Sequence, residues 1–294
     1  MKNYRIYIII AISGLLTSCG LKKENEWKPL LDNELTEWQT YLSYALTDSF
    51  RFTAPLDEFQ NPAPPIGYDK NERNVFSVYQ ENDEWILRIS GEIYGCIFTK
   101  KDFQNYHLRL KVKFGTLKWT PRLEKAKDSG ILYHSTGECG VDGWLSWMTS
   151  QEFQVMEGGT KEGNSGDYWS VAAARIQVRA SIPEGETNYF YNPEADWVDL
   201  GAGREQGLCR AADYNSPKGE WTTMELICHE GKSLHIVNGH VVMALKNSRY
   251  WNGYESLPLI QGKIQLQSEA AEVFYKDIEI KQLDKMPEQY ERFF

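Results

Sequence analysis

The residues best suited to acid–base chemistry lie in one short segment, 152–157, with the sequence EFQVME. Alternation along a strand places Glu152 and Gln154 on one face and Glu157 on the other. Glu157 joins the first two only if a bulge or the strand end intervenes, and two glycines follow it directly. Polar side chains on the face of a buried strand need hydrogen-bonding partners, which sugar hydroxyls can supply. The alternative is the solvent-facing side of an edge strand.

A second candidate segment, 128–134, is a short apolar run that ends in Tyr133 and His134. Histidine can act as an acid, a base or a ligand near neutral pH. A lone histidine also has a plainer explanation. One of the two side chains then belongs to the core and the other to the surface.

Tryptophans are abundant, at 10 in the chain, and their flat faces can stack on the C–H faces of sugars. Most tryptophans are simply buried or partly buried in the core. Trp144, Trp147 and Trp169 bracket the 152–157 segment in the sequence. These three are therefore our candidates for stacking on a sugar.

Period-two alternation predicts the strands that must position these residues. The clearest run is 106–114, YHLRLKVKF, in which apolar and charged or polar side chains alternate without a break. Asn238-Gly239 lies between two such runs and predicts a tight hairpin, since both residues tolerate positive φ. Further strands are predicted at 74–80, 84–90, 93–99, 130–134, 151–157, 175–179, 222–229, 233–237, 241–245, 263–268 and 273–281.

Many short strands without long helical periodicity predict an all-β fold, a jelly-roll sandwich of two antiparallel sheets. Two stretches, 39–72 and 183–219, lack clear alternation. Long loops in a compact domain are more often functional than idle, so we expect these two to form the rim of a binding cleft.

Composition limits the partners. The chain has 294 residues, 41% of them hydrophobic, which excludes a disordered chain. Its net charge of −9 argues against nucleic acid and against an anionic membrane surface, because both require a basic face. A neutral ligand such as a carbohydrate is compatible with this charge.

The N-terminus predicts export. Two early cationic residues precede an apolar run, 6–16, that is too short for an ordinary transmembrane helix. The run ends in LTSC, which resembles the lipoprotein box of bacteria. We therefore expect a signal peptide over 1–18, a lipidated Cys19 that begins a tether over 19–34, and one domain over 35–294. A plain signal peptide or a membrane anchor is the alternative.

This organisation predicts a protein anchored by lipid to the bacterial cell envelope, at the outer membrane, with the periplasmic or surface face left open. The lipid is then its only contact with the membrane. Export leads to an oxidising compartment, where Cys96, Cys139, Cys209 and Cys228 allow three pairings. Cys96 and Cys228 lie in apolar runs typical of buried thiols, and a bridge between Cys139 and Cys209 stays open.

Six motifs occur in an order that resembles the 3-keto-disaccharide hydrolase domain family of exported bacterial proteins, over roughly residues 27–283. They are GEIYGCIFTKKDFQNYHLRLKVKFG, KDSGILYH, SQEFQVMEGG with GDYW, GEWTTMELI, VNGHVV and GKIQLQSEAAEVFYKDIEIKQL. The family has a concanavalin-like jelly roll. The resemblance implies action on glycosides already oxidised at the 3-hydroxyl. A base removes the hydrogen at C2, the enolate expels the aglycone from C1, and water then adds.

The resemblance also implies site residues. The catalytic candidates are Glu152, Gln154, Glu157, His134 and Lys100. His134 or Glu152 would act as the base, and Lys100 or a divalent metal ion would stabilise the enolate oxygen. The substrate-binding candidates are Tyr133, Trp147, Asp167, Tyr168 and Trp169.

Two other functions stay open. EFQVME is also similar to the E-x-D-x-x-E strand of laminarinase-type retaining glycosidases, where two carboxylates lie roughly 5–5.5 Å apart. Here the central position is Gln154 rather than Asp. The third function is a glycan-binding surface lipoprotein without catalysis, because jelly rolls serve both uses. The oligomeric state is left open.

Overall fold

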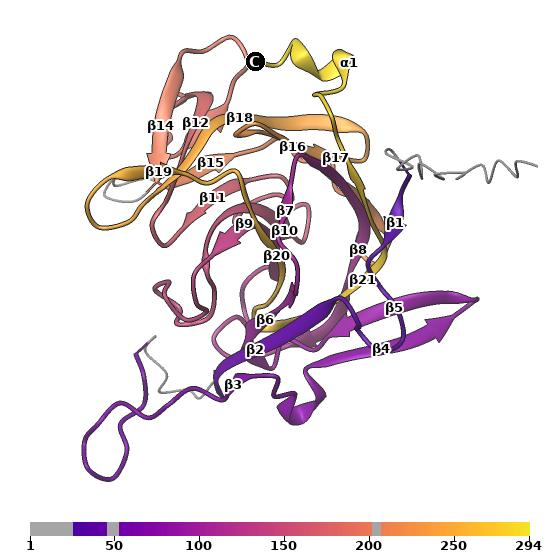
Figure 1. Cartoon of the computed structure of the whole chain (residues 1–294), viewed down its shortest axis with the longest axis vertical. Helices are drawn as coiled ribbons and strands as arrows, with labels where there is room; N and C mark the ends of the chain where they lie inside the picture. The colour runs from indigo at the N-terminus through magenta and orange to yellow at the C-terminus, as the bar shows by residue number, and fades with distance from the viewer. Residues whose placement is uncertain (1–25, 46–52, 202–206) are drawn as a thin grey trace, which may run out of the picture.

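Alternating strands form the predicted sandwich of two sheets in a computed structural model that describes residues 26–45, 53–201 and 207–294. Figure 1 shows β8 and β21 in one curved layer and β9, β10 and β20 in the layer beside it. All named strand pairs are antiparallel except one short parallel pair between β13 and β15. The predicted all-β jelly-roll sandwich is confirmed.

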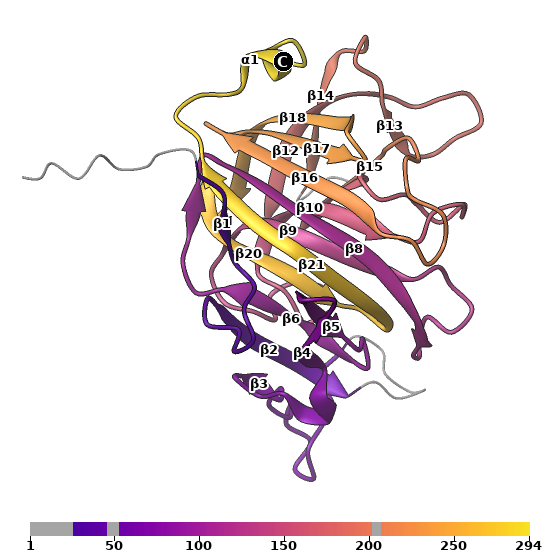
Figure 2. The ribbon, with the colours of Figure 1, turned by 90° about the vertical axis from the view of Figure 1, so that its right-hand side faces the viewer.

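The first layer, sheet A, presents its long central strands to the viewer in Figure 2. In spatial order it contains β4 (Phe76–Glu81), β5 (Glu84–Ile89), β21 (Ala271–Gln282), β8 (Tyr106–Lys118), β16 (Thr222–His229), β17 (Lys232–Val237), β18 (His240–Trp251), β12 (Ala174–Ser181) and β14 (Trp197–Gly201), with β1 (Lys28–Pro29) beside β21 and β19 (Ser256–Pro258) beside β18.

The second layer, sheet B, carries the segments singled out for chemistry. In spatial order it contains β3 (Gly67–Tyr68), β2 (Trp38–Ala45), β6 (Ile93–Thr99), β20 (Gln261–Ser268), β9 (Asp128–Thr136), β10 (Thr149–Met156), β11 (Tyr168–Val171), β15 (Leu208–Arg210) and β13 (Tyr189–Tyr191), with β7 (Phe103–Gln104) beside β20.

The main core lies between the two sheets. Alternate residues of β8 from Tyr106 to Val112 are buried there, while the charged residues between Leu108 and Val112 stay partly exposed. The same cluster includes Ile131 of β9 and Phe153 of β10. This burial of apolar surface is the main stabilising contribution to the sandwich.

A second apolar cluster covers the opposite face of sheet B. Leu132 of β9 belongs to it, and so do Trp147 and Met148 from the segment that precedes β10. We call residues 137–148 the cover loop, because this loop packs on the face of sheet B that points away from sheet A. Alternate residues of β9 and β10 thus point into two different environments.

The Asn238-Gly239 hairpin is confirmed, with φ values of 47° and 79° at the two residues. These angles match a two-residue turn with positive φ at both central positions. Predicted strand ends agree within a few residues for most runs, because a half-buried strand carries its own period-two signal.

The two stretches predicted as irregular contain strands. Strand β2 begins at Trp38 and continues into 39–72, and it is disrupted by a register shift between Leu42 and Ala45, which obscures its alternation. Strands β13 to β15 lie within 183–219 and are short. Leu30 and Leu31, which we assigned to the tether, are buried beside β1. The folded body therefore starts before residue 35.

The four cysteines in the described residues are free and buried. Cys139 Sγ lies 3.9 Å from Cys96 Sγ, on the cover-loop side of sheet B. Cys209 lies in the core cluster between the sheets. The Cys139–Cys209 bridge is therefore absent, because the two thiols face opposite sides of sheet B.

The chain ends in one short helix, α1 (Glu288–Glu291), at the end of the sandwich opposite to β2 and β3 (Figure 2). A 3₁₀ turn spans Glu72–Asn74. Within the described residues, every helix is too short or too polar to cross a bilayer. Cys19 and the predicted signal peptide lie outside the described residues.

Candidate functional site

A cavity of about 390 Å³ lies on the cover-loop face of sheet B. Its floor comes from β9, β10 and β20, and its walls come from β11, the cover loop and the loop that precedes β9. The residues that line it are Arg122, Lys125, Asp128, Asp142, Gly143, Trp144, Trp147, Glu152, Gln154, Met156, Glu162, Trp169, Ser170, Val171, Ala172, Gln267 and Glu269. This volume and its mixture of tryptophans and polar groups suit a small polar ligand.

Glu152 lies at the floor of this cavity, and its side chain is 6% exposed. It sits opposite Leu132 in the β9–β10 ladder and therefore shares a face with the cover-loop cluster. Among the described residues, no hydrogen bond or ion pair to the Glu152 carboxyl is present. A buried carboxyl without a partner favours its neutral form, and burial raises the pKa of Glu152 well above its ordinary value.

An arginine joins two other carboxyl groups beside Glu152. Arg122 Nη2 lies 2.6 Å from Asp128 Oδ2 and makes a short contact with Glu269 Oε1. Gln154 Nε2 donates to the second oxygen of Asp128, Oδ1, also in a short contact. We call Arg122, Asp128, Glu269 and Glu152 the open network, because all four line the cavity.

The electrostatics of the open network are dominated by burial. Desolvation raises the pKa of Asp128 and of Glu269, while the Arg122 guanidinium lowers both. The charges of Glu269 and Asp128 add to the effect of burial on the pKa of Glu152. Like charges disfavour further ionisation, so burial and the two neighbouring carboxylates both favour the protonated form of Glu152.

Trp144, Trp147 and Trp169, the three candidates for stacking on a sugar, all line the cavity. Trp147 is 3% exposed and donates through Nε1 to Gly95 O at 2.9 Å, so it is part of the wall rather than a free surface. Trp169 is 39% exposed and therefore offers a ring face to a ligand.

The cover loop is held in shape by one carboxylate. Asp142 Oδ1 accepts the backbone N–H groups of Ser146 and Trp147, both at 2.7 Å, and Oδ2 accepts that of Trp144 at 2.8 Å. This arrangement fixes both tryptophans of the loop at the cavity. Asp142 therefore positions the wall.

His134 and Tyr133 lie on the other side of sheet B. A register shift in the β9–β20 ladder accompanies φ = 51° at His134, so both side chains point into the sandwich. The His134 ring lies 5.8 Å from the Tyr106 ring, and Tyr133 Oη lies 2.8 Å from Ser233 Oγ. Burial lowers the pKa of His134 to about 4. His134 therefore lies on the opposite side of sheet B from Glu152. The irregularity that turns its side chain inward cannot be recognised from the alternation of residue types in the sequence.

Glu157 and Lys100 also lie outside the cavity. No bulge intervenes between Glu152 and Glu157, so Glu157 keeps the opposite face and pairs with Lys127 at 3.1 Å and with Lys218 at 3.5 Å. Lys100 Nζ donates to Thr36 O at 2.7 Å on the surface. Neither residue lines the cavity.

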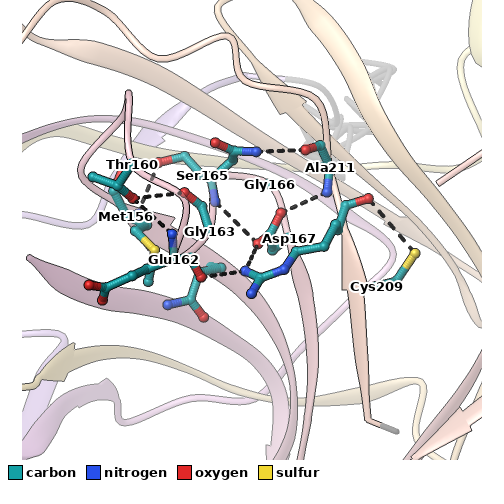
Figure 3. A network of polar contacts seen from close by, with 12 residues as sticks. Met156, Thr160, Glu162, Gly163, Ser165, Gly166, Asp167, Cys209 and Ala211 are labelled. Atoms are coloured by element: carbon teal, nitrogen blue, oxygen red, sulfur yellow. Dashed lines mark hydrogen bonds and ion pairs between the residues drawn. The ribbon is translucent and has the colours of Figure 1, made fainter. Parts of the chain in front are cut away.

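Asp167 and Tyr168 serve the fold. Asp167 Oδ2 accepts from Arg210 at 2.8 Å and from the Asn164 N–H at 3.1 Å, while Oδ1 accepts from the Ala211 N–H at 2.7 Å (Figure 3). We call Asp167 and its three partners, Asn164, Arg210 and Ala211, the closed network. Tyr168 is fully buried and donates to Gln151 Oε1 at 2.6 Å. Both side chains lie outside the cavity lining.

Several cavity residues were not among the sequence candidates. Asp128 stands two residues before Gly130 and four before Leu132, so alternation could have placed it on the face of Glu152. Arg122 and Glu269 come from loops, where no periodicity predicts a direction. Gln267 lies on β20, far from β10 in sequence and brought near it through β9.

The residues present do not fit a metal ion. Within the described part of the chain, no group of three or more His, Cys, Asp or Glu side chains is placed to hold one. Asp128 and Glu269 are already bridged by a guanidinium, which supplies the positive charge between them.

The described parts of the two loops expected to form the rim contribute nothing to the cavity. Residues 39–45, 53–72, 183–201 and 207–219 are missing from the cavity lining, whose described residues come from 122–172 and from 267–269. The described parts of both stretches instead contribute strands to the edges of the sheets.

Several solved structures are similar to this chain. A structure from Parabacteroides distasonis with a provisional glycosyl hydrolase name is 16% identical with a TM-score of 0.48, covering 88% of this chain and 100% of that chain. A β-glucanase of Bacillus licheniformis is 11% identical with a TM-score of 0.38, covering 89% and 99%. The carbohydrate-binding module CBM66 from Bacillus subtilis is 6% identical with a TM-score of 0.40, covering 70% and 92%.

None of the curated proteins compared with the sequence matches it significantly. A family model does match, over residues 26–281, which is nearly all of the described chain. Its description is the 3-keto-alpha-glucoside-1,2-lyase-like domain, in agreement with the family that the six motifs indicate. The chain therefore belongs to the 3-keto-alpha-glucoside-1,2-lyase-like domain family.

Proposed function

We propose that this protein cleaves glycosidic bonds in disaccharides or glycosides that carry a ketone at C3, by removing the proton at C2. Membership of the family supports an activity on glycosides of this kind. The observation that carries the proposal is the buried Glu152 carboxyl, which has no partner among the described residues and lies in a cavity beside the exposed ring of Trp169.

The ketone makes elimination accessible, because it acidifies the hydrogen on C2. In the first step the ionised Glu152 takes this proton, and the electrons of the C2–H bond move to form the C2–C3 double bond of an enolate. In the second step the enolate electrons return, a C1–C2 double bond forms, and the bond from C1 to the aglycone oxygen breaks. The leaving oxygen gains a proton from Glu152. Water adding across the new double bond completes hydrolysis.

The environment of Glu152 suits both proton transfers. A general base or acid works best when its pKa lies near the working pH, and burial moves the pKa of Glu152 in that direction. Arg122 holds the neighbouring Asp128 and Glu269 in place. Their remaining lone pairs can accept hydrogen bonds from sugar hydroxyls. The retaining mechanism finds less support, because Glu157 faces the other side of β10.

The first experiment compares a 3-keto-disaccharide with its unoxidised parent. We expect cleavage of the first and none of the second, and a slower reaction when deuterium replaces hydrogen at C2. Cleavage of the parent, or a covalent intermediate at Glu152, would indicate a retaining glycosidase instead. Binding of both sugars without turnover would indicate a glycan-binding protein and overturn the proposal.

We also propose that the mature protein is anchored by a lipid on Cys19, in the bacterial cell envelope. The support is the sequence LTSC after a short apolar run. Metabolic labelling with a fatty acid tests this directly. We expect label on the wild-type protein and none on Cys19→Ser, which should leave the membrane fraction.

A further inference from the structure

Three of the buried glutamines in sheet B differ in how their amides form hydrogen bonds. Gln151 Nε2 donates to Arg175 O at 2.9 Å and its Oε1 accepts from Tyr168. Gln265 Nε2 donates to Ser135 Oγ at 2.8 Å and its Oε1 accepts from Cys96 at 3.1 Å. Gln267 is fully buried, yet neither of its amide atoms has a hydrogen-bond partner in the described chain.

The unused amide lies in the cavity next to Glu152. Strand β9 runs between β10 and β20, and the flanking side chains of Glu152 and Gln267 lean over Gly130 from either side. A Cβ at position 130 would lie 2.5 Å from Oε1 of Glu152 and 2.5 Å from Oε1 of Gln267. The glycine thus leaves room for two polar groups to converge at one point of the floor.

The Gln267 amide contributes no hydrogen bond to the stability of the described fold. A buried polar group without a partner destabilises the protein relative to an apolar side chain of the same shape. Gln265, two residues earlier on the same face, shows that this strand can satisfy a buried glutamine when it is structural. An unpartnered amide in the wall of a cavity is therefore placed for a ligand.

We propose that the Gln267 amide is a further catalytic group, whose N–H donates to the C3 carbonyl oxygen of the oxidised sugar. This inference rests on the proposed function. C2 and C3 are adjacent atoms, so a base at C2 and a donor at O3 must be neighbours, as Glu152 and Gln267 are across Gly130. The amide can turn by half a rotation to present Nε2, because neither orientation breaks a bond.

The donor acts where charge develops. When Glu152 removes the C2 proton, negative charge moves to O3, and a hydrogen bond to that oxygen strengthens in the transition state. A ketone oxygen only accepts hydrogen bonds. An N–H aimed at O3 is therefore the kind of group that this oxygen can bind.

The test uses Gln267→Leu and Gln267→Glu in the full-length protein, with a 3-keto-disaccharide as substrate. We expect Gln267→Leu to lower kcat/KM by about 100-fold or more, the usual loss for one oxyanion donor, with most of the loss in kcat. Gln267→Glu keeps the shape but removes the donor at high pH, so its activity should fall further as the pH rises.

Stability separates this role from a structural one. Because the amide makes no hydrogen bonds, Gln267→Leu should unfold at the same temperature as the wild type or higher, whereas Gln265→Leu should unfold at a lower temperature. Wild-type activity with unchanged kcat/KM in Gln267→Leu would overturn this inference alone. A lower unfolding temperature for Gln267→Leu than for Gln265→Leu would do the same. Absence of wild-type activity on the ketone would instead overturn the proposed function.

Discussion

The open and the closed networks are both buried clusters of carboxylate and arginine, yet they serve opposite purposes. In the closed network both oxygens of Asp167 are bonded, to Arg210 and to backbone N–H groups (Figure 3). In the open network Arg122 bridges two carboxylates while Glu152 beside them has no partner in the described residues. Unused hydrogen-bonding capacity next to a cavity, rather than charge or burial alone, marks the site.

The largest expected effect is on catalysis at the open network. Glu152→Gln keeps the shape but removes the base, so turnover of a 3-keto-disaccharide should fall by about 10²- to 10⁴-fold, the range for general acid–base groups. Circular dichroism should show an unchanged fold.

Glu157→Gln is the matched control from the same stretch of chain. Its carboxylate pairs with lysines on the opposite face, so we expect a change in rate of about two-fold or less. Equal losses in the two variants would favour a pair of catalytic carboxylates and contradict the comparison.

The closed network should respond in stability instead. Asp167→Asn leaves Arg210 with an uncompensated charge, and breaking a buried ion pair typically costs about 3–5 kcal/mol. Urea denaturation should show this loss in the free energy of unfolding. Activity per folded molecule should stay close to that of the wild type. A stable but inactive Asp167→Asn would place Asp167 in the site after all.

The dependence on pH sharpens the comparison further. The pKa of Glu152 is raised above 4.5 in the folded protein, so the folded state binds this proton more tightly than the unfolded state does. The stabilisation of the folded state by this proton is complete below the ordinary pKa of 4.5. It declines as the pH rises from 4.5 through the raised pKa of the folded state, by up to about 1.4 kcal/mol per pH unit.

Glu152→Gln removes this dependence. The variant should gain stability relative to the wild type as the pH rises above 4.5, in urea denaturation at several pH values. Activity of the wild type should rise over the same range, because the base must be ionised. A constant difference in stability between pH 4 and pH 8 would contradict the raised pKa.

The smallest expected effect concerns the aromatic wall. Trp169→Ala should raise KM by about 2- to 10-fold with little change in kcat, because ring stacking contributes about 0.5–1.5 kcal/mol. Trp251→Ala is the control, since Trp251 is also 39% exposed but lies on sheet A above Arg175. Equal effects on KM would show that Trp169 does not contact the sugar.

Much of the fold and part of the site could be predicted from the chain alone. Alternation in 106–114 and 152–157 indicates which side chains share a face, and this placed Glu152 and Gln154 correctly together. Trp147 and Trp169 were found because they flank that strand. Strand β2 was not predicted because a register shift breaks its alternation, and β11 was not predicted because it is too short to show any.

The remaining positions depended on contacts between distant segments. The His134 side chain turns inward at an irregularity of the β9–β20 ladder, and no residue type in this segment predicts that irregularity. Asp128, Glu269 and Gln267 reach Glu152 only because β9 pairs with β10 on one side and with β20 on the other.

The sequence by itself determined the class of fold, the family, and the strand that carries Glu152, because local alternation and motif order are properties of the chain. Only the tertiary structure decided which carboxylates have all their oxygens in hydrogen bonds or ion pairs and which, like Glu152, have no partner among the described residues. That distinction arises from pairing between strands far apart in sequence and from burial, and neither is encoded within a single segment.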